Sequence, residues 1–169
     1  MCAAWPAGLL RLLDGHDLEA RVGIIVQLMT VDDDGWPHVA LLSAGEVVFQ
    51  PPDRALLALW PQSSTSGNLI ARRLALLCVA FEGAWWLARL EVVTTGPLAD
   101  LQEPRLGVLA RLVHLRADTV PYAQLDGSLH FQLTDPSEVV SRWRRTIISL
   151  RAAYQPPGQD PPDSRDVGP

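Results

Sequence analysis

The stretch Trp60-Pro-Gln-Ser-Ser-Thr-Ser-Gly-Asn-Leu69 places four consecutive hydroxyl side chains between two elements of regular structure. The apolar run 55–60 predicts a strand, and the pattern of 69–73 predicts the start of a short helix. The first backbone N–H groups of a helix lack intrahelical acceptors and carry the positive end of the helix dipole. The stretch therefore suits a bound anion such as phosphate. A plain helix cap at Ser63 or Ser64 is an equally good interpretation, because serine is favoured there.

Upstream of this stretch, the sequence predicts strands joined by short turns. β-Branched residues dominate 22–31, an acidic turn follows at 32–35, and an apolar run resumes at 37–42, so we expect a hairpin. A further extended piece at 46–49 ends at two prolines. At the N-terminus, Pro6 and the leucines after it predict a short helix.

Downstream, 74–81 and 84–95 predict two strands joined by a tight turn. Leucines spaced along one side of 104–116, behind Pro104, predict a helix. The alternation in 129–133 predicts a half-exposed strand. Asp135 followed by proline, with Glu138 three residues after the aspartate, predicts the start of a last helix.

The order of these elements predicts a mainly β fold with flanking helices. Strands that follow one another through hairpins favour an antiparallel sheet closed into a barrel, and we count six or seven of them. We expect one domain over 1–154, with helices at its start, middle and end. The segment 155–169 has five prolines and no large apolar side chain, so we expect it to be a disordered tail.

Composition narrows the functional class. Of 169 residues, 48% are hydrophobic and 20% charged, which is typical of a globular protein. The net charge of −5 argues against a nucleic-acid partner held by phosphate contacts. No apolar run is long enough to span a membrane, and the N-terminus does not read as a secretory signal. Two cysteines predict no disulfide framework, so we expect a cytoplasmic protein with neither a membrane nor a nucleic-acid partner.

Several motifs occur in a familiar order. An acidic turn leads to Gly35-x-Pro37-His38, and Ser63-x-Thr65-x-x-Asn68-Leu69 follows at a fixed distance downstream. Over residues 20–98 this order resembles the pyridoxamine 5′-phosphate oxidase-like, FMN-binding split-barrel superfamily, in particular its small, unassigned bacterial branch. The resemblance implies a six-stranded antiparallel split β-barrel, a homodimer with two FMN sites at its interface, and a flavin-dependent oxidoreductase acting on a small molecule.

The resemblance also implies which residues contact the cofactor. Ser64, Thr65 and Ser66 match phosphate-contacting positions, and Asn68 matches the residue that holds the following turn. The full set of implied cofactor-binding residues is Ser43, Trp60, Pro61, Gln62, Ser63, Ser64, Thr65, Ser66 and Asn68. No general acid or base is implied, because the flavin itself carries out the electron transfer.

One departure from the superfamily pattern keeps a second hypothesis open. Flavin-binding relatives place an arginine or lysine in the hydroxyl segment or on the second strand, whereas here neither has one. Charge-assisted hydrogen bonds are about twice as strong as neutral ones, so this phosphate site lacks its strongest donor. The alternative is a non-enzymatic dimeric scaffold or small-ligand-binding module that has lost tight FMN binding. A haem-handling relative is a weaker alternative, since no histidine occupies a convincing axial position.

Three other groups of residues bear on function. The histidines at 16, 38, 114 and 130 show no metal-ligand spacing, so we predict no metal site. Trp85 and Trp86 fall on opposite faces of a strand, and we expect one in the core and the other at a dimer interface, with stacking on a ligand as the alternative. The basic cluster Arg142, Arg144 and Arg145 reads as the solvated face of the last helix, with an anion or an acidic partner as the alternative.

Overall fold

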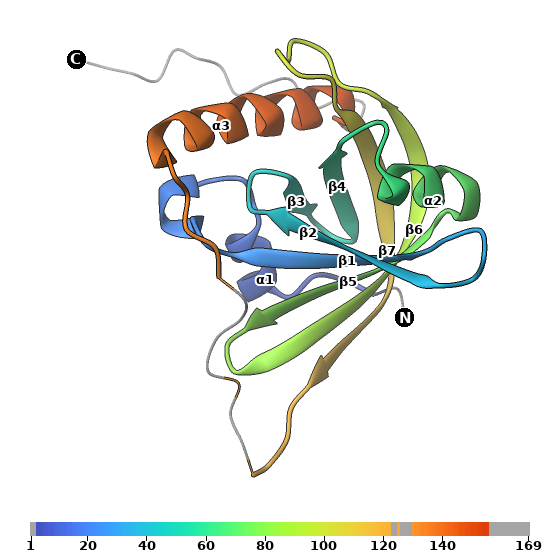
Figure 1. The fold of residues 1–169 in the computed structure, drawn as a ribbon. Helices are drawn as coiled ribbons and strands as arrows, with labels where there is room; N and C mark the ends of the chain where they lie inside the picture. The colour runs from blue at the N-terminus through green and yellow to red at the C-terminus, as the bar shows by residue number, and fades with distance from the viewer. Residues whose placement is uncertain (1–2, 123–124, 126–129, 156–169) are drawn as a thin grey trace.

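The computed structural model describes residues 3–122, 125 and 130–155. Seven strands form one antiparallel sheet in the order β2-β1-β5-β6-β7-β4-β3. Their bounds are β1 Ile25–Val31, β2 Pro37–Ser43, β3 Val47–Gln50, β4 Arg54–Leu59, β5 Leu74–Phe81, β6 Ala84–Pro97 and β7 Leu106–Asp118. The sheet curls around a core of its own side chains, and Figure 1 shows the strands wrapping into an incomplete barrel. The predicted split-barrel fold is therefore confirmed, although the sheet has seven strands rather than six.

The seventh strand is the segment that the leucine pattern assigned to a helix, so the prediction of a helix over 104–116 was wrong. Residues 106–118 form β7, which pairs with β4 on one side and with β6 on the other. In this strand Val108, Ala110 and Leu112 alternate into the core with exposures of at most 2%. Pairing on both edges and burial of alternate residues outweigh a weak local helical preference.

The strand predicted over 129–133 is also wrong where it can be checked. Residues 130–133 are irregular, and Leu129 lies outside the described residues. Phe131 and Leu133 pack against the last helix instead of pairing with a strand. The predicted tail, apart from Gln155, also lies outside the described residues.

Three α-helices and a 3₁₀-helix cover the sheet: α1 Ala7–Leu12, η1 Leu18–Arg21, α2 Ser64–Arg72 and α3 Pro136–Ala153. The start of α3 is as predicted, because the Asp135 carboxylate accepts a hydrogen bond from the Glu138 N–H at 3.0 Å. At the other end of the chain, Trp5 stacks on Phe49 with ring centroids 3.8 Å apart. α1 and Trp5 belong to the barrel core.

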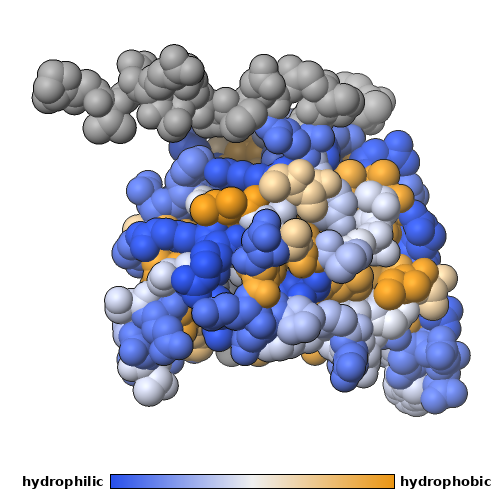
Figure 2. All heavy atoms as spheres, turned by 90° about the horizontal axis from the view of Figure 1, so that it is seen from above, coloured by the Kyte–Doolittle hydropathy of each residue, from blue (hydrophilic) through white to orange (hydrophobic). Residues whose placement is uncertain are grey.

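α3 lies across the outside of the barrel, over β3 and β4 (Figure 1). Its Trp143, Ile147 and Leu150 pack on Val48 and Leu56, forming a second hydrophobic cluster outside the barrel. Seen from the side of α3, the surface is mainly hydrophilic, with scattered apolar side chains between the charged ones (Figure 2). Within the described residues, no helix combines the length and apolarity that crossing a membrane requires.

The outer face of β1, β2 and β5 carries no helix comparable to α3 among the described residues. Val31 on β1, Val39 and Leu41 on β2, and Leu74 on β5 are all more than 40% exposed. The strand registers place these residues in adjacent rows, since Met29 on β1 pairs with both Val39 and Leu76. Contiguous exposed apolar side chains of this kind mark interaction surfaces.

Candidate functional site

The junction between β4 and α2 is built largely by its own hydroxyl groups. Ser63 is the N-cap of α2, and its Oγ accepts from the Ser66 N–H at 3.2 Å. The Ser66 hydroxyl is completely buried and donates to the Trp60 carbonyl at 2.7 Å. The two hydroxyl oxygens lie 3.1 Å apart. Ser63 and Ser66 are thus committed to the turn and are poorly placed to bind a ligand.

The remaining polar residues of this segment have different environments. Thr65 is only 2% exposed, and Asn68 Nδ2 donates to Thr30 Oγ1 at 3.0 Å, which fastens α2 to β1. Ser64 is exposed at the first position of the helix. Helix geometry leaves the backbone N–H groups of Ser64 and Thr65 without intrahelical acceptors. The Ser64 hydroxyl and these two N–H groups are therefore the donors available to an anion.

The arginines at the end of α2 bind backbone carbonyls. Arg72 Nη2 donates to the Asp32 carbonyl at 2.6 Å. Arg73 Nη2 donates to the carbonyls of Val92 and Val93, both at 2.7 Å. Among the described residues, no basic side chain of this chain is hydrogen-bonded to Ser63–Ser66.

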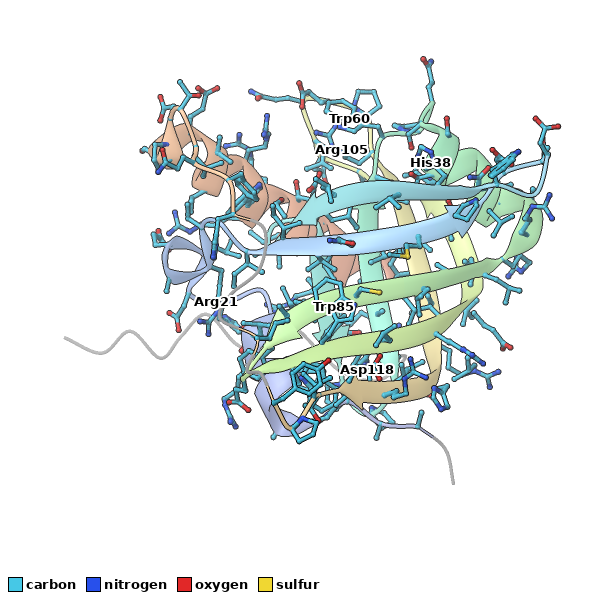
Figure 3. All side chains as sticks on the ribbon, turned by 60° about the horizontal axis from the view of Figure 1, so that its bottom comes forward. Arg21, His38, Trp60, Trp85, Arg105 and Asp118 are labelled. Atoms are coloured by element: carbon cyan, nitrogen blue, oxygen red, sulfur yellow. The ribbon has the colours of Figure 1, made fainter. Side chains whose placement is uncertain are left out.

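Trp60 lies at the end of β4 against an arginine that the sequence did not indicate. Leu59 pairs with Leu106, so the residues that flank this pair, Trp60 and Arg105, come together. The Arg105 guanidinium lies 3.3 Å from the centroid of the Trp60 ring, a cation–π contact (Figure 3). Trp60 is 49% exposed whereas Arg105 is only 6% exposed. Sequence reasoning missed Arg105 because it assigned this segment to a helix.

Ser43 is also engaged within the chain. Its N–H and its hydroxyl both donate to the Glu46 carboxylate at 2.8 Å. These two residues line a hollow of about 280 Å³ whose other wall includes Arg142 and Trp143. Arg142 also lines the pocket that contains Arg105, so the structure brings the ends of β2 and β4 close to the middle of α3. Pro61 and Gln62 are both exposed in the turn that precedes α2.

A larger hollow lies on the outer face of the sheet. It measures about 520 Å³ and is mostly apolar, with side chains from β1, β5, β6 and β7. Its lining includes Met29, Val31, Leu74, Leu76 and Arg89. This hollow adjoins the exposed apolar rows of β1, β2 and β5 and offers room for a flat apolar group.

The remaining residues that the sequence singled out lie apart from these hollows. Trp86 packs against the barrel core and donates its indole N–H to the Phe81 carbonyl at 3.2 Å, while Trp85 is half-buried on the opposite face. In the part of the chain that the structure describes, no three His, Cys, Asp or Glu side chains gather as metal ligands. Burial raises the pKa of the Cys78 thiol, which therefore stays protonated and unreactive near neutral pH.

Comparison with known proteins adds a sequence relative. YclD of Bacillus subtilis strain 168, an uncharacterized protein, is 35% identical over 143 residues, which span 85% of this chain and 93% of YclD. This chain belongs to the YclD family. No protein-family model matches the sequence.

Several solved structures resemble the fold of this chain. An F420 reductase superposes with a TM-score of 0.51 at 16% identity, covering 66% of this chain and 98% of the reductase. An FMN-binding protein from Syntrophomonas wolfei gives 0.48 at 15% identity, covering 66% and 87%. A candidate pyridoxamine 5′-phosphate oxidase from Lactobacillus delbrueckii gives 0.49 at 19% identity, covering 68% and 94%. At these identities the likeness concerns the fold.

Proposed function

We propose that this member of the YclD family binds FMN as a homodimer and acts as a flavin-dependent oxidoreductase on a small molecule. The observation that carries the proposal is the start of α2 on a split barrel, where Ser64 is exposed and two N–H groups lack intrahelical acceptors. These donors suit a phosphate group. A neighbour of the same fold is described as an F420 reductase, which supports a flavin-type cofactor as the natural candidate.

The residues present fit such a cofactor in two respects. Ser64 and the N–H groups of Ser64 and Thr65 would hold the phosphate. The apolar outer hollow, with Met29 and Leu76 in its lining, would receive the ring and exclude water from it. When bound, the flavin supplies the electron-transfer chemistry, and the protein orients it and tunes its electronics.

The exposed apolar face of β1, β2 and β5 supports the proposed homodimer. Val39, Leu41 and Leu74 are each at least 48% exposed, which is costly for a monomer in water. A second copy packed on this face would bury these rows and close the outer hollow.

The test is the visible absorption spectrum of the purified protein, before and after FMN is added and the excess removed. We expect retained flavin bands in the wild type and at least tenfold weaker retention in Ser64→Ala, because a hydrogen bond to a charged group contributes about 1.5–3 kcal/mol. Ser64→Glu distinguishes a loss of FMN binding from a loss of folding. A carboxylate at a helix start favours the helix but repels a phosphate, so this variant should fold normally and lose FMN.

Ser137 provides the matched control, because it is an exposed serine in the first turn of α3. Ser137→Ala and Ser137→Glu should retain FMN as the wild type does. Equal FMN affinity in Ser64→Glu and the wild type would contradict the proposed phosphate site.

The second candidate is a dimeric scaffold or small-ligand-binding module without tight FMN binding. It is favoured by the use of Ser63 and Ser66 inside the turn and by the engagement of Arg72 and Arg73 with carbonyls. A protein that is dimeric in solution, colourless as purified and unable to retain added FMN would support this candidate over the first.

A further inference from the structure

We propose that the pocket between the loop 98–105 and α3 is a carboxylate-binding site that Glu103 occupies in the ligand-free protein. We call it the arginine pocket, and the residues that define it are Arg105, Arg142 and Arg145 with Glu103 and Glu138. Its volume is about 110 Å³, room for a small acid group. The proposal concerns neither the hydroxyl segment nor FMN, so it stands independently of the proposed function.

The charge of the arginine pocket favours a monoanion. Three guanidinium groups and two carboxylates line it, which leaves a net charge of +1 (3 − 2). Arg142 and Arg145 lie three residues apart on α3, a spacing that puts both on one face of the helix.

Arg105 is the buried member of the set. Two of the five N–H donors of its guanidinium are hydrogen-bonded, one to the Pro104 carbonyl at 3.1 Å and one to Glu103 at 3.0 Å. The Trp60 ring covers one face of the guanidinium. Burying a charge is costly unless it is paired, so a guanidinium this buried calls for an anion at its open donors.

Glu103 is the anion that pairs with the Arg105 guanidinium, but it binds there weakly. One carboxylate oxygen lies 3.0 Å from Arg105 Nη2 and 4.0 Å from Arg142 Nη1, so it sits between the two arginines. The Glu103 side chain is nevertheless 48% exposed, and ion pairs with an exposed partner contribute little. A ligand carboxylate can replace it at small cost, because the displaced Glu103 turns into water. Glu103 thus shows where a carboxylate binds and competes with the ligand for that place.

The experiment follows the indole N–H signal of Trp60 by NMR, assigned with Trp60→Phe, while sodium acetate is added at constant ionic strength. We expect a saturable shift in the wild type. Arg142→Gln and Arg145→Gln should each weaken binding about tenfold, as expected for loss of a charge-assisted hydrogen bond. Glu103→Gln should tighten binding several-fold, because it removes the competing carboxylate.

Arg144→Gln is the matched control. Arg144 lies on the same helix but pairs with Glu19, away from the arginine pocket, so its loss should leave acetate binding unchanged. FMN retention should be the same in the wild type and in the Glu103, Arg142, Arg144 and Arg145 variants, which separates this test from that of the proposed function.

Three results would overturn the proposal. The first is that acetate causes no saturable shift in either the wild type or Glu103→Gln. The second is that acetate binds equally tightly to the wild type and to the Arg142 and Arg145 variants. The third is that inorganic phosphate binds more tightly than acetate. The last result would assign the pocket to phosphate instead.

Discussion

Gly45 provides the sharpest test of how α3 is seated on the barrel. A Cβ atom at this position would lie 1.9 Å from Cγ of Trp143 and 2.4 Å from its Cβ. Rotation about χ1 can move Cγ but not Cβ, whose position is fixed by the backbone of α3, so a rotamer change alone cannot relieve the clash. To restore an ordinary contact of 3.4 Å at the Trp143 Cβ, the backbone of α3 must move by about 1.0 Å (3.4 − 2.4).

We therefore expect Gly45→Ala to destabilise the protein strongly. Trp143 is 4% exposed and packs edge-to-face on Phe131, so displacing it disrupts the second hydrophobic cluster. Overpacking typically costs about 1–3 kcal/mol, and the position of the clash favours the upper end. For a domain of this size, about 3 kcal/mol lowers the melting temperature by roughly 6–12 °C.

The assay is urea unfolding followed by circular dichroism, with Gly67→Ala as the control. Gly67 lies inside α2, and a methyl group added there would meet nothing within 4 Å, so alanine should stabilise the helix by about 0.5–1 kcal/mol. Trp143→Leu should be destabilising by itself and should leave most of the additional cost of Gly45→Ala in place, because leucine keeps the Cβ and Cγ atoms at this position. If Gly45→Ala unfolds within about 0.5 kcal/mol of the wild type, the close approach of Trp143 to Gly45 is refuted.

Three further predictions concern stability. Asp135→Ala removes the cap of α3 and should cost about 1 kcal/mol in urea unfolding, whereas Asp135→Asn should restore most of it. Asn68→Ala should cost about 1–3 kcal/mol because it leaves the buried Thr30 hydroxyl without its partner, and Thr30→Val added to it should cost little more. Burial raises the pKa of Cys78, so the folded state keeps this proton to higher pH than the unfolded state. The free energy of unfolding should therefore fall as pH rises through the ordinary thiol pKa, and it should fall less in Cys78→Ala. If the free energy of unfolding falls equally with pH in the wild type and in Cys78→Ala, this prediction is contradicted.

Some features of the candidate sites can be predicted from the sequence, and others depend on contacts between distant parts of the chain. The hydroxyl stretch and the start of α3 were visible because caps depend on residues close together in the chain. That Ser66 bonds the Trp60 carbonyl and that Asn68 bonds Thr30 could not be read from spacing, because both depend on how α2 settles against its neighbours. Arg105 was missed entirely, since its role comes from the pairing of β4 with β7.

The sequence by itself determined the local features of this protein: the hairpins, the cap residues and a succession of strands typical of an antiparallel sheet. These depend on turn chemistry and on side-chain periodicity, which act over a few residues. The tertiary structure alone decided that 106–118 is a strand, that the apolar rows of β1, β2 and β5 stay exposed, and that Arg105 and Arg142 line one pocket with Glu103. The physical reason is that sheet pairing and burial join residues far apart in the chain, and their energy exceeds the small local preferences that a sequence displays.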